Sequence, residues 1–151
     1  MPKTISKDIP LSEITLRRYE KPTSYTKREL TRKLCLSIGL LQPGDSRDII
    51  VDILQVLLNN RHKKVLMNSE EIRERVIKSR QKQKLPVKGV ASSNVRRQLI
   101  RLKDIYIVEN LKNQYRITDH EKLHYIFSKH IKDFYLKNIL ERVEDYFKEI
   151  K

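Results

Sequence analysis

The stretch SSNVRRQLIRLKD, residues 92–104, combines cationic and amide side chains with a helical apolar pattern. At 100° per residue, three apolar side chains fall within about 60° of one another: Val95, Leu99 and Leu102. Three polar side chains lie on the far side of the same helix: Asn94, Arg97 and Arg101. Guanidinium and amide groups can form paired hydrogen bonds with nucleic-acid bases, and guanidinium groups also bind phosphates. The spacing therefore predicts a helix with one face in a core and the other on an anionic ligand.

Residues 120–124, HEKLH, match the H-E-x-x-H signature of zinc metalloproteases. On one continuous helix, His120 and His124 would share a face and could ligate zinc, with Glu121 as general base. The longer form of this signature needs a glycine turn before its third histidine, and this sequence has none there. On a continuing helix His130 would lie about 240° around and about 9 Å along the axis from His124. We favour the interpretation that these histidines simply lie on a helix surface. A zinc ion shared by His120 and His124 is the second interpretation, and a protease is the third. We therefore expect no metal site.

The composition is typical of one globular domain without disulfides. The chain has 151 residues, of which 38% are hydrophobic, enough for one compact core. Its single cysteine, Cys35, excludes an intramolecular disulfide and a multi-cysteine zinc site, and we expect it on an apolar helix face. No apolar run is long enough to cross a bilayer, and the start MPKTISKDIP lacks the apolar segment of a secretory signal. We expect a soluble cytoplasmic protein without a membrane partner.

The positive charge is concentrated upstream of residue 119. The net charge is +14, whereas residues 119–151 hold seven basic and seven acidic side chains and are neutral. No acidic residue occurs between Glu74 and Asp104, a stretch that contains ten Lys and Arg residues. A field of this sign concentrates phosphate polymers near the surface. The alternative is a generally basic, solvated surface without a specific partner.

Three segments follow from these patterns. Residues 1–25 are weakly patterned and punctuated by prolines, so we expect an N-terminal arm. Residues 26–118 form a basic domain, with its core motif in residues 45–118. Residues 119–151 form a helical tail.

Capping residues and apolar periodicity predict three helices ahead of residue 92. The first begins at Thr26, which has capping-box spacing to Glu29, and ends at Gly39. Its inward side chains are Leu30, Leu34 and Ile38. Asp45 caps the second helix, whose wide apolar face marks the centre of the core: Ile49, Ile50, Ile53, Leu54, Leu57 and Leu58. The third opens at Asn68 and buries Ile72, Val76 and Ile77.

Two alternating runs rich in β-branched and aromatic residues follow residue 104. Residues 105–109 and 114–118 are predicted strands, and residues 110–113 join them in a hairpin. Thr118 and Glu121 then repeat the capping-box spacing, which predicts that the tail helix begins at this point.

This order of helix, helix, basic helix and hairpin, with the sequence SSNVRRQLIRLKDIYIVENLKNQYRIT, resembles the winged helix-turn-helix superfamily of DNA-binding proteins. The resemblance covers residues 45–118, about half of the chain. It implies a mainly α fold with a small β-hairpin wing, followed here by the C-terminal helical tail. It also implies that helix 92–103, capped by Ser92, lies in the DNA major groove and that the wing, residues 105–118, touches the backbone or minor groove. The segment ahead of this helix is longer than the usual tight turn, which leaves the orientation of the helix open.

The resemblance assigns DNA contacts by position. The expected base-reading side chains are Ser93, Asn94, Arg97, Gln98 and Arg101. Backbone or wing contacts are expected from Lys82, Lys84, Lys88, Ser92, Arg96, Lys112 and Arg116. A guanidinium suits guanine, an Asn amide suits adenine, and a helix N-terminus favours a phosphate. For any single arginine, a solvated helix face is an equally good interpretation.

The tail carries a short heptad pattern of apolar residues: Leu136, Leu140, Val143, Phe147 and Ile150. An upstream stripe has a different register, which predicts a kink or a change of partner: Leu123, Phe127, Ile131 and Phe134. We expect this tail to form a homodimer, because DNA-reading modules commonly pair to span two half-sites. The alternative is that the tail packs back on its own domain.

The sequence thus favours a dimeric, sequence-preferring double-stranded DNA-binding protein, most simply a transcriptional regulator associated with the nucleoid. We expect no enzymatic activity and no cofactor. Three other functions stay open: a replication, segregation or nucleoid protein with weak sequence preference, a winged-helix protein-interaction adaptor, and a zinc metalloprotease. Structured RNA is an alternative partner.

Overall fold

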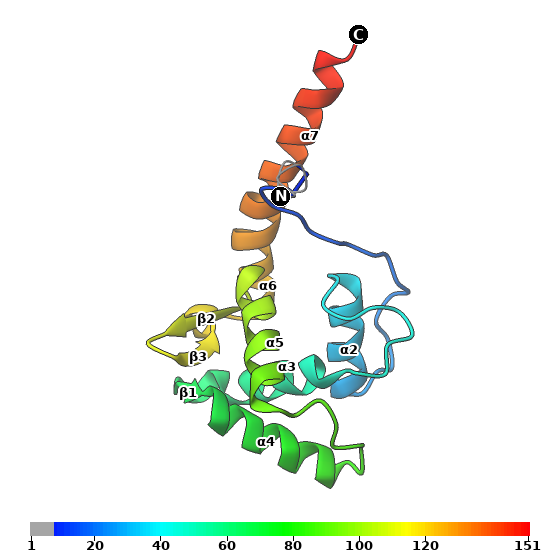
Figure 1. Cartoon of the computed structure of the whole chain (residues 1–151). Helices are drawn as coiled ribbons and strands as arrows, with labels where there is room; N and C mark the ends of the chain where they lie inside the picture. The colour runs from blue at the N-terminus through cyan, green and yellow to red at the C-terminus, as the bar shows by residue number, and fades with distance from the viewer. Residues whose placement is uncertain (1–7) are drawn as a thin grey trace, which may run out of the picture.

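The computed structural model describes residues 8–151, which are mainly helical with a small antiparallel sheet and a long C-terminal helix (Figure 1). The body contains α2 (Lys27–Ser37), α3 (Ile49–Asn60), a 3₁₀ turn (Arg61–Lys63), β1 (Met67–Asn68), α4 (Ser69–Lys82), α5 (Ser92–Asp104), β2 (Val108–Leu111) and β3 (Gln114–Ile117). The tail follows as a 3₁₀ turn (Thr118–His120), α6 (Leu123–Ile126), a π-helical stretch (Phe127–Leu136) and α7 (Lys137–Glu149). The predicted fold class is confirmed, with α2 as an additional helix ahead of the motif.

The core is built around α3, which packs against α2, α4 and α5. All the predicted core positions of α3 are buried except Leu58, which is half-buried. The three apolar residues of α5 are also fully buried, as predicted: Val95, Leu99 and Leu102. In α2 the prediction is wrong for Leu30, which is exposed, whereas Thr31 and Cys35 are buried. Of the other two predicted positions, Leu34 is half-buried and Ile38, which follows the helix, is buried as predicted. Burial of these apolar surfaces is the main source of stability and fixes the orientation of α5.

A deeply buried ion-pair network links α2, α3 and α4. Asp52 of α3 has a fully buried side chain and pairs with Arg28 of α2 and with Arg80 of α4. Asp48, which precedes α3, pairs with the same two arginines. Burial raises the pKa of the Asp52 carboxyl, whereas the two guanidinium groups favour its charged form. The network pairs the charges of Arg28 and Arg80 with carboxylates, so neither guanidinium adds an unpaired positive charge to the surface.

The sheet has the strand order β1-β3-β2, with both pairs antiparallel. Met67 lies opposite Tyr115, so the strand ahead of α4 joins the edge of the hairpin. The hairpin turn consists of Lys112 and Asn113, both with positive φ, as a type I′ turn requires. The order of elements from α3 to β3 is therefore that of the helical motif with a β-hairpin wing that the resemblance implies.

The first strand of the hairpin begins later than predicted. The chain at Tyr106 adopts a left-handed conformation with a φ of 68° and ends α5. The Tyr106 N–H donates to the Lys103 carbonyl and the Ile107 N–H donates to the Leu102 carbonyl, which is a Schellman motif. Residues 105–107 therefore close the helix, and the strand begins at Val108.

Two of the five predicted helix starts have the expected caps. The Thr26 hydroxyl accepts the Glu29 N–H, and Asn68 and Glu71 form a complete capping box. The prediction for Asp45 is wrong, because its carboxylate accepts the Arg47 N–H in a loop and α3 begins only after Asp48.

The other two predicted caps are also wrong. Ser92 is the first residue of α5 rather than its cap, and Ala91 precedes it without a side-chain hydrogen bond. The Thr118 hydroxyl donates to the Tyr106 carbonyl, so it ties the wing to the end of α5 instead of starting a helix. The tail helix begins at Leu123.

The described part of the predicted arm, residues 8–25, has no helix or strand and is tied to the body; residues 1–7 lie outside the described residues. The Arg17 guanidinium donates to the Leu36 and Leu41 carbonyls and thereby binds the C-terminal end of α2. Thr15 lies against Gly39, which has a φ of +76° and where an added Cβ would come within 2.6 Å of the Thr15 Cβ. The arm therefore fixes the α2–α3 connection.

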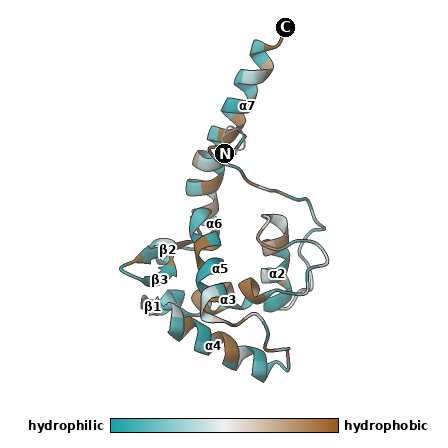
Figure 2. Cartoon of the chain, in the orientation of Figure 1, coloured by the Kyte–Doolittle hydropathy of each residue, from teal (hydrophilic) through white to brown (hydrophobic). Residues whose placement is uncertain are grey.

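The tail changes register through its π-helical stretch. A π-helical turn contains more residues than an α-helical turn, so residues five positions apart lie on the same face. Ile126 and Ile131 are therefore both buried. Of the predicted stripe, Phe127 and Phe134 are exposed instead. α7 has no buried residue and projects away from the body (Figures 1 and 2). The alternative in which the whole tail packs on its own domain is therefore wrong for α7.

Candidate nucleic-acid interface

The outward face of α5 carries exposed polar and cationic residues near its N-terminal end. Ser93, Arg96 and Arg97 are exposed, and their side chains make no hydrogen bond or ion pair with residues 8–151. Ile100, one turn further on, is 51% exposed. Because the opposite face is anchored in the core, these side chains are presented on a fixed helix. Ser93 and Arg97 therefore stay available as base-reading residues.

The other three predicted base-reading residues are hydrogen-bonded within the chain. The Asn94 amide donates to the Gly89 carbonyl at 2.7 Å and accepts from the Gln98 amide at 3.1 Å. Arg101 donates to the Gln98 side chain at 2.8 Å and to the Gly39 carbonyl at 3.3 Å. This row links the loop ahead of α5 to the end of α2. All three are half-buried, so they hold α5 in place rather than extend from it.

A cavity of about 450 Å³ lies beside this row, between α5 and the loop that joins α2 to α3. Arg97 and Lys88 line it together with Asp45 and Arg47. The structure thus brings one predicted backbone contact, Lys88, to the same opening as four predicted base-reading residues: Asn94, Arg97, Gln98 and Arg101. Sequence reasoning missed Arg47, which is exposed and carries an additional positive charge at this edge.

The loop of residues 83–91 is held in place by arginines of α4. The Arg73 Nε donates to the Val90 carbonyl at 2.6 Å, and the Arg80 Nε donates to the Pro86 carbonyl at 2.7 Å. Lys84 and Lys88 are exposed on this loop, as a backbone-contacting role requires. The long connection is therefore an ordered part of the fold, with its lysines on the outside.

In the wing, Lys112 has no hydrogen-bond or ion-pair partner among residues 8–151, whereas Arg116 has two. Lys112 is exposed at the tip of the hairpin turn. Arg116 pairs with Glu109 on the neighbouring strand and lies 3.5 Å from Asp119. Its charge is therefore neutralised locally, and it stabilises the hairpin.

The HEKLH residues do not lie on one helix. Asp119 and His120 have left-handed backbone conformations and Glu121 is extended, whereas His124 lies in α6. The geometry that the metalloprotease signature requires is therefore absent. His130, the candidate third ligand, stacks on Tyr106 with 5.6 Å between ring centroids. Among residues 8–151, no group of three or more His, Cys, Asp or Glu residues could hold a metal ion.

His120, which is half-buried, and Cys35, which is fully buried, have shifted pKa values. Burial lowers the pKa of His120, whose Nδ1 is buried without a hydrogen-bond partner among the described residues. Burial raises the pKa of the Cys35 thiol to about 12, so this thiol stays protonated and unreactive. The sequence prediction that Cys35 lies on an apolar helix face is confirmed.

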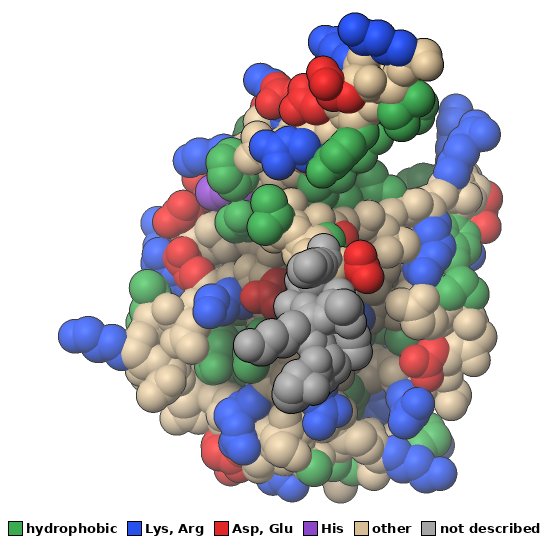
Figure 3. All heavy atoms as spheres, turned by 45° about the horizontal axis from the view of Figure 1, so that its top comes forward, with side chains coloured by type: hydrophobic (Ala, Val, Ile, Leu, Met, Phe, Trp, Pro, Cys, Tyr) green, Lys and Arg blue, Asp and Glu red, His purple; other side chains and the backbone are tan. Residues whose placement is uncertain are grey.

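The predicted dimerisation residues form an uncovered stripe on the tail. Leu136 is half-buried, and four further apolar side chains are exposed: Leu140, Val143, Phe147 and Ile150. Figure 3 shows hydrophobic side chains along the tail beside both positive and negative ones, whereas Lys and Arg side chains are spread over the body. The single chain leaves this stripe in contact with solvent.

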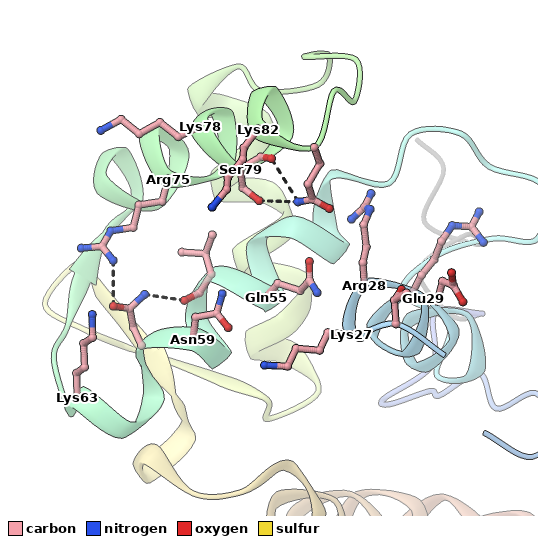
Figure 4. Close-up of a pocket in the computed structure, with 15 residues that line it drawn as sticks. Lys27, Arg28, Glu29, Gln55, Asn59, Lys63, Arg75, Lys78, Ser79 and Lys82 are labelled. Carbon is pink, nitrogen blue, oxygen red and sulfur yellow. Dashed lines mark hydrogen bonds between the residues drawn. The ribbon is translucent and has the colours of Figure 1, made fainter. Parts of the chain in front are cut away.

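A second basic surface, which sequence reasoning missed, lies between α2 and α4 with α3 as its floor (Figure 4). We call it the α2–α4 groove; its volume is about 900 Å³. Its basic lining residues are Lys27, Arg28, Arg32, Lys63, Arg75, Lys78 and Lys82. The sequence already showed a run of basic residues in α4, which includes the lysines that line this groove. The basic residues of α2 and of the turn after α3 come close to them only in the folded chain. Lys82, predicted as a contact beside α5, lines this groove instead.

Comparison of the chain with protein-family models, with curated proteins and with solved structures found no match. The winged-helix resemblance therefore rests on the order of the elements and the topology of the sheet. Among residues 8–151, no helix combines the length and apolar character needed to cross a membrane.

Proposed function

We propose that this protein binds double-stranded DNA, with the N-terminal half of α5 in the major groove and the wing on the adjacent backbone. The observation that carries the proposal is the set of exposed side chains at the start of α5 that have no partner among residues 8–151, on a helix whose other face is anchored in the core. Lys88 of the loop 83–91 lines the same opening, and Lys84 is exposed on that loop. A rigid helix with free guanidinium groups suits base recognition.

Within this proposal the α5 residues have two roles. Arg97 reads a base, with a guanine as the natural partner of its guanidinium, and Ser93 contacts a base or phosphate. Ile100, which is exposed one turn further along α5, contacts a thymine methyl group in this proposal. Asn94 and Arg101 position the helix through their hydrogen bonds within the chain.

We further propose that two copies associate through the apolar stripe of α7. The partner is a second copy because the stripe repeats at heptad spacing, the tail is electrically neutral, and one chain leaves it uncovered. A dimer would present two α5 helices to two half-sites, which fits a transcriptional regulator that acts by occupying its site.

One observation favours a second candidate function, a replication, segregation or nucleoid protein with weak sequence preference. Three of the five predicted base-reading residues are held by hydrogen bonds within the chain. Fewer side chains are then free to read bases, while the backbone-contacting lysines stay exposed. Such a protein would bind long duplexes with similar affinity regardless of sequence.

Fluorescence anisotropy of a labelled random-sequence 30-bp duplex at two salt concentrations tests the proposal. We expect binding at micromolar concentration or tighter that falls steeply with salt, and weak competition by single-stranded RNA. Selection of a preferred site, followed by affinity measurements on two variants, then separates the two candidates. Arg97→Ala should reduce the difference in binding free energy between the preferred site and a random duplex by about 1–3 kcal/mol. Lys112→Ala should lower the affinity for every duplex by the same factor. Absence of duplex binding at low salt would contradict DNA binding, and equal effects of both variants on every sequence would favour the nucleoid function.

A further inference from the structure

Four lysines of the α2–α4 groove have no hydrogen-bond or ion-pair partner among residues 8–151: Lys27, Lys63, Lys78 and Lys82. They come from α2, from the turn after α3 and from α4. In Figure 4, Lys82 and Lys27 extend toward the floor from opposite walls. Glu29 is the one acidic residue among the described lining residues. The groove therefore concentrates positive charge that the fold itself does not neutralise.

The floor and walls of the groove are polar. Gln55 and Asn59 contribute amides from α3, and Arg75 is held by the Asn60 side chain at 2.9 Å. Lysine ammonium groups bind phosphates as point charges, and amide and hydroxyl groups commonly bind phosphate and sugar oxygens. Val56 is the one aliphatic residue among the described lining residues. This polar lining does not suit a small apolar ligand.

The lining also distinguishes between forms of nucleic acid. No aromatic side chain is present among the described lining residues of the groove, whereas proteins that hold single strands usually stack the bases on aromatic rings. A duplex offers its phosphates on the outside and needs no stacking surface. The chemistry therefore fits the backbone of a duplex.

The groove and the face of α5 lie on different sides of the molecule. Arg73, whose Nε contacts the Val90 carbonyl just ahead of α5, marks the side of α4 that faces that helix. At 100° per residue, Lys78 and Lys82 lie about 140° and about 180° around α4 from Arg73. No residue of α5 or of the wing is among the described lining residues of the groove. One duplex held by α5 therefore leaves the groove open.

We propose that the α2–α4 groove binds the phosphate backbone of a second DNA duplex, so that one chain bridges two DNA segments. The inference rests on the proposed binding of a first duplex by α5. The lysines and amides of the groove contact phosphates and sugars, and no helix of the groove enters the major groove to contact bases. Its affinity for DNA is therefore independent of sequence and strongly dependent on salt.

The test is the number of 12-bp duplexes bound per chain at saturation in low salt, measured by native mass spectrometry and by fluorescence titration. We expect two duplexes per chain for the wild type and one for the variant with Lys78→Glu and Lys82→Glu. Both side chains are exposed and make no hydrogen bond or ion pair with the described residues, so the variant keeps the fold, which circular dichroism and thermal melting verify. A variant with Arg96→Glu and Arg97→Glu should also bind one duplex, because only the α5 site is lost.

A control variant with Lys129→Glu and Lys132→Glu changes the net charge by the same amount on exposed tail positions and should still bind two duplexes. One duplex per wild-type chain, lost on substitution in α5 and kept on substitution in α4, would overturn the groove proposal and leave the proposed function standing. The reverse pattern would place the single duplex in the groove, which would contradict DNA binding by α5 and overturn the bridging of two duplexes. Loss of one duplex in the control would show a general charge effect and overturn the groove proposal.

Discussion

At the scale of single residues, the folded chain separates arginines that hold the structure from arginines that face solvent. Arg80 is 5% exposed and binds the buried carboxylate of Asp52 together with a loop carbonyl. Arg97 is exposed on α5 and makes no ion pair within the described part of the chain. Both lie in the same acid-free stretch of sequence, and nothing in their local spacing distinguishes them. The difference arises because Asp52 interrupts the apolar face of α3 at the point that α4 crosses.

Arg80→Ala should destabilise the protein by about 3–5 kcal/mol, because it leaves the buried Asp52 carboxylate with one cationic partner instead of two. The measurement is the free energy of unfolding from urea denaturation followed by circular dichroism. Lys78→Ala on the exposed side of the same helix is the matched control and should change stability by less than about 0.5 kcal/mol. Equal stability of Arg80→Ala and the wild type would mean that Asp52 is not held as an ion pair.

At the scale of elements, the spacing of apolar residues predicted which segments are helices and which are strands. This works because a helix or strand that buries one face has apolar residues at a regular spacing. The boundaries were less predictable where side chains make long-range contacts. Thr118 has the spacing of a cap, but its hydroxyl is taken by the Tyr106 carbonyl, so the tail helix begins later. Tyr106 ends α5 in a left-handed conformation that sequence rules assign to glycine or asparagine. Its ring packs against His130 and Phe134 of the tail, contacts that no local pattern reveals.

The connection between the wing and the tail should make stability depend on pH. Burial lowers the pKa of His120 below its ordinary value of 6.5, so the unfolded chain binds a proton more readily than the folded chain. The stabilisation is complete above pH 6.5 and is lost as the pH falls through the folded-state pKa. We expect the melting temperature of the wild type to fall between pH 7 and pH 5.

His120→Asn should reduce that fall, because asparagine tolerates the left-handed backbone and does not titrate. His124→Asn, at an exposed position of α6, is the control and should melt with the pH dependence of the wild type. An unchanged pH dependence in His120→Asn would show that His120 titrates normally in the folded protein.

At the scale of the whole molecule, charge and apolar surface are distributed over different parts. The basic body and the neutral tail were evident from the sequence, because net charge is a sum over residues. Two features required the fold: the α2–α4 groove, which combines residues from three elements, and the projection of α7 away from the body. The first gives the body two basic faces, and the second leaves an apolar stripe that a second copy can cover.

Substitution of the α7 stripe should change the oligomeric state and DNA binding together. A variant with Leu140→Glu and Phe147→Glu, whose side chains are 59% and 77% exposed in the single chain, should fold normally but place charges in the dimer seam. We expect light scattering to give the mass of one chain, 18.1 kDa, for the variant and twice that mass for the wild type. Affinity for a 30-bp duplex should fall by about 100-fold, because the second α5 no longer binds from the same complex.

The control variant carries Arg142→Gln and Lys148→Gln, which change the net charge equally but lie outside the heptad stripe. It should remain a dimer, because these residues make only exposed contacts with Asp145 and Glu144 on the same helix. A wild-type mass of one chain at micromolar concentration would contradict dimerisation through α7. Duplex binding would then depend on one α5 alone, and the two faces of the body would be the remaining means by which this protein could connect DNA segments.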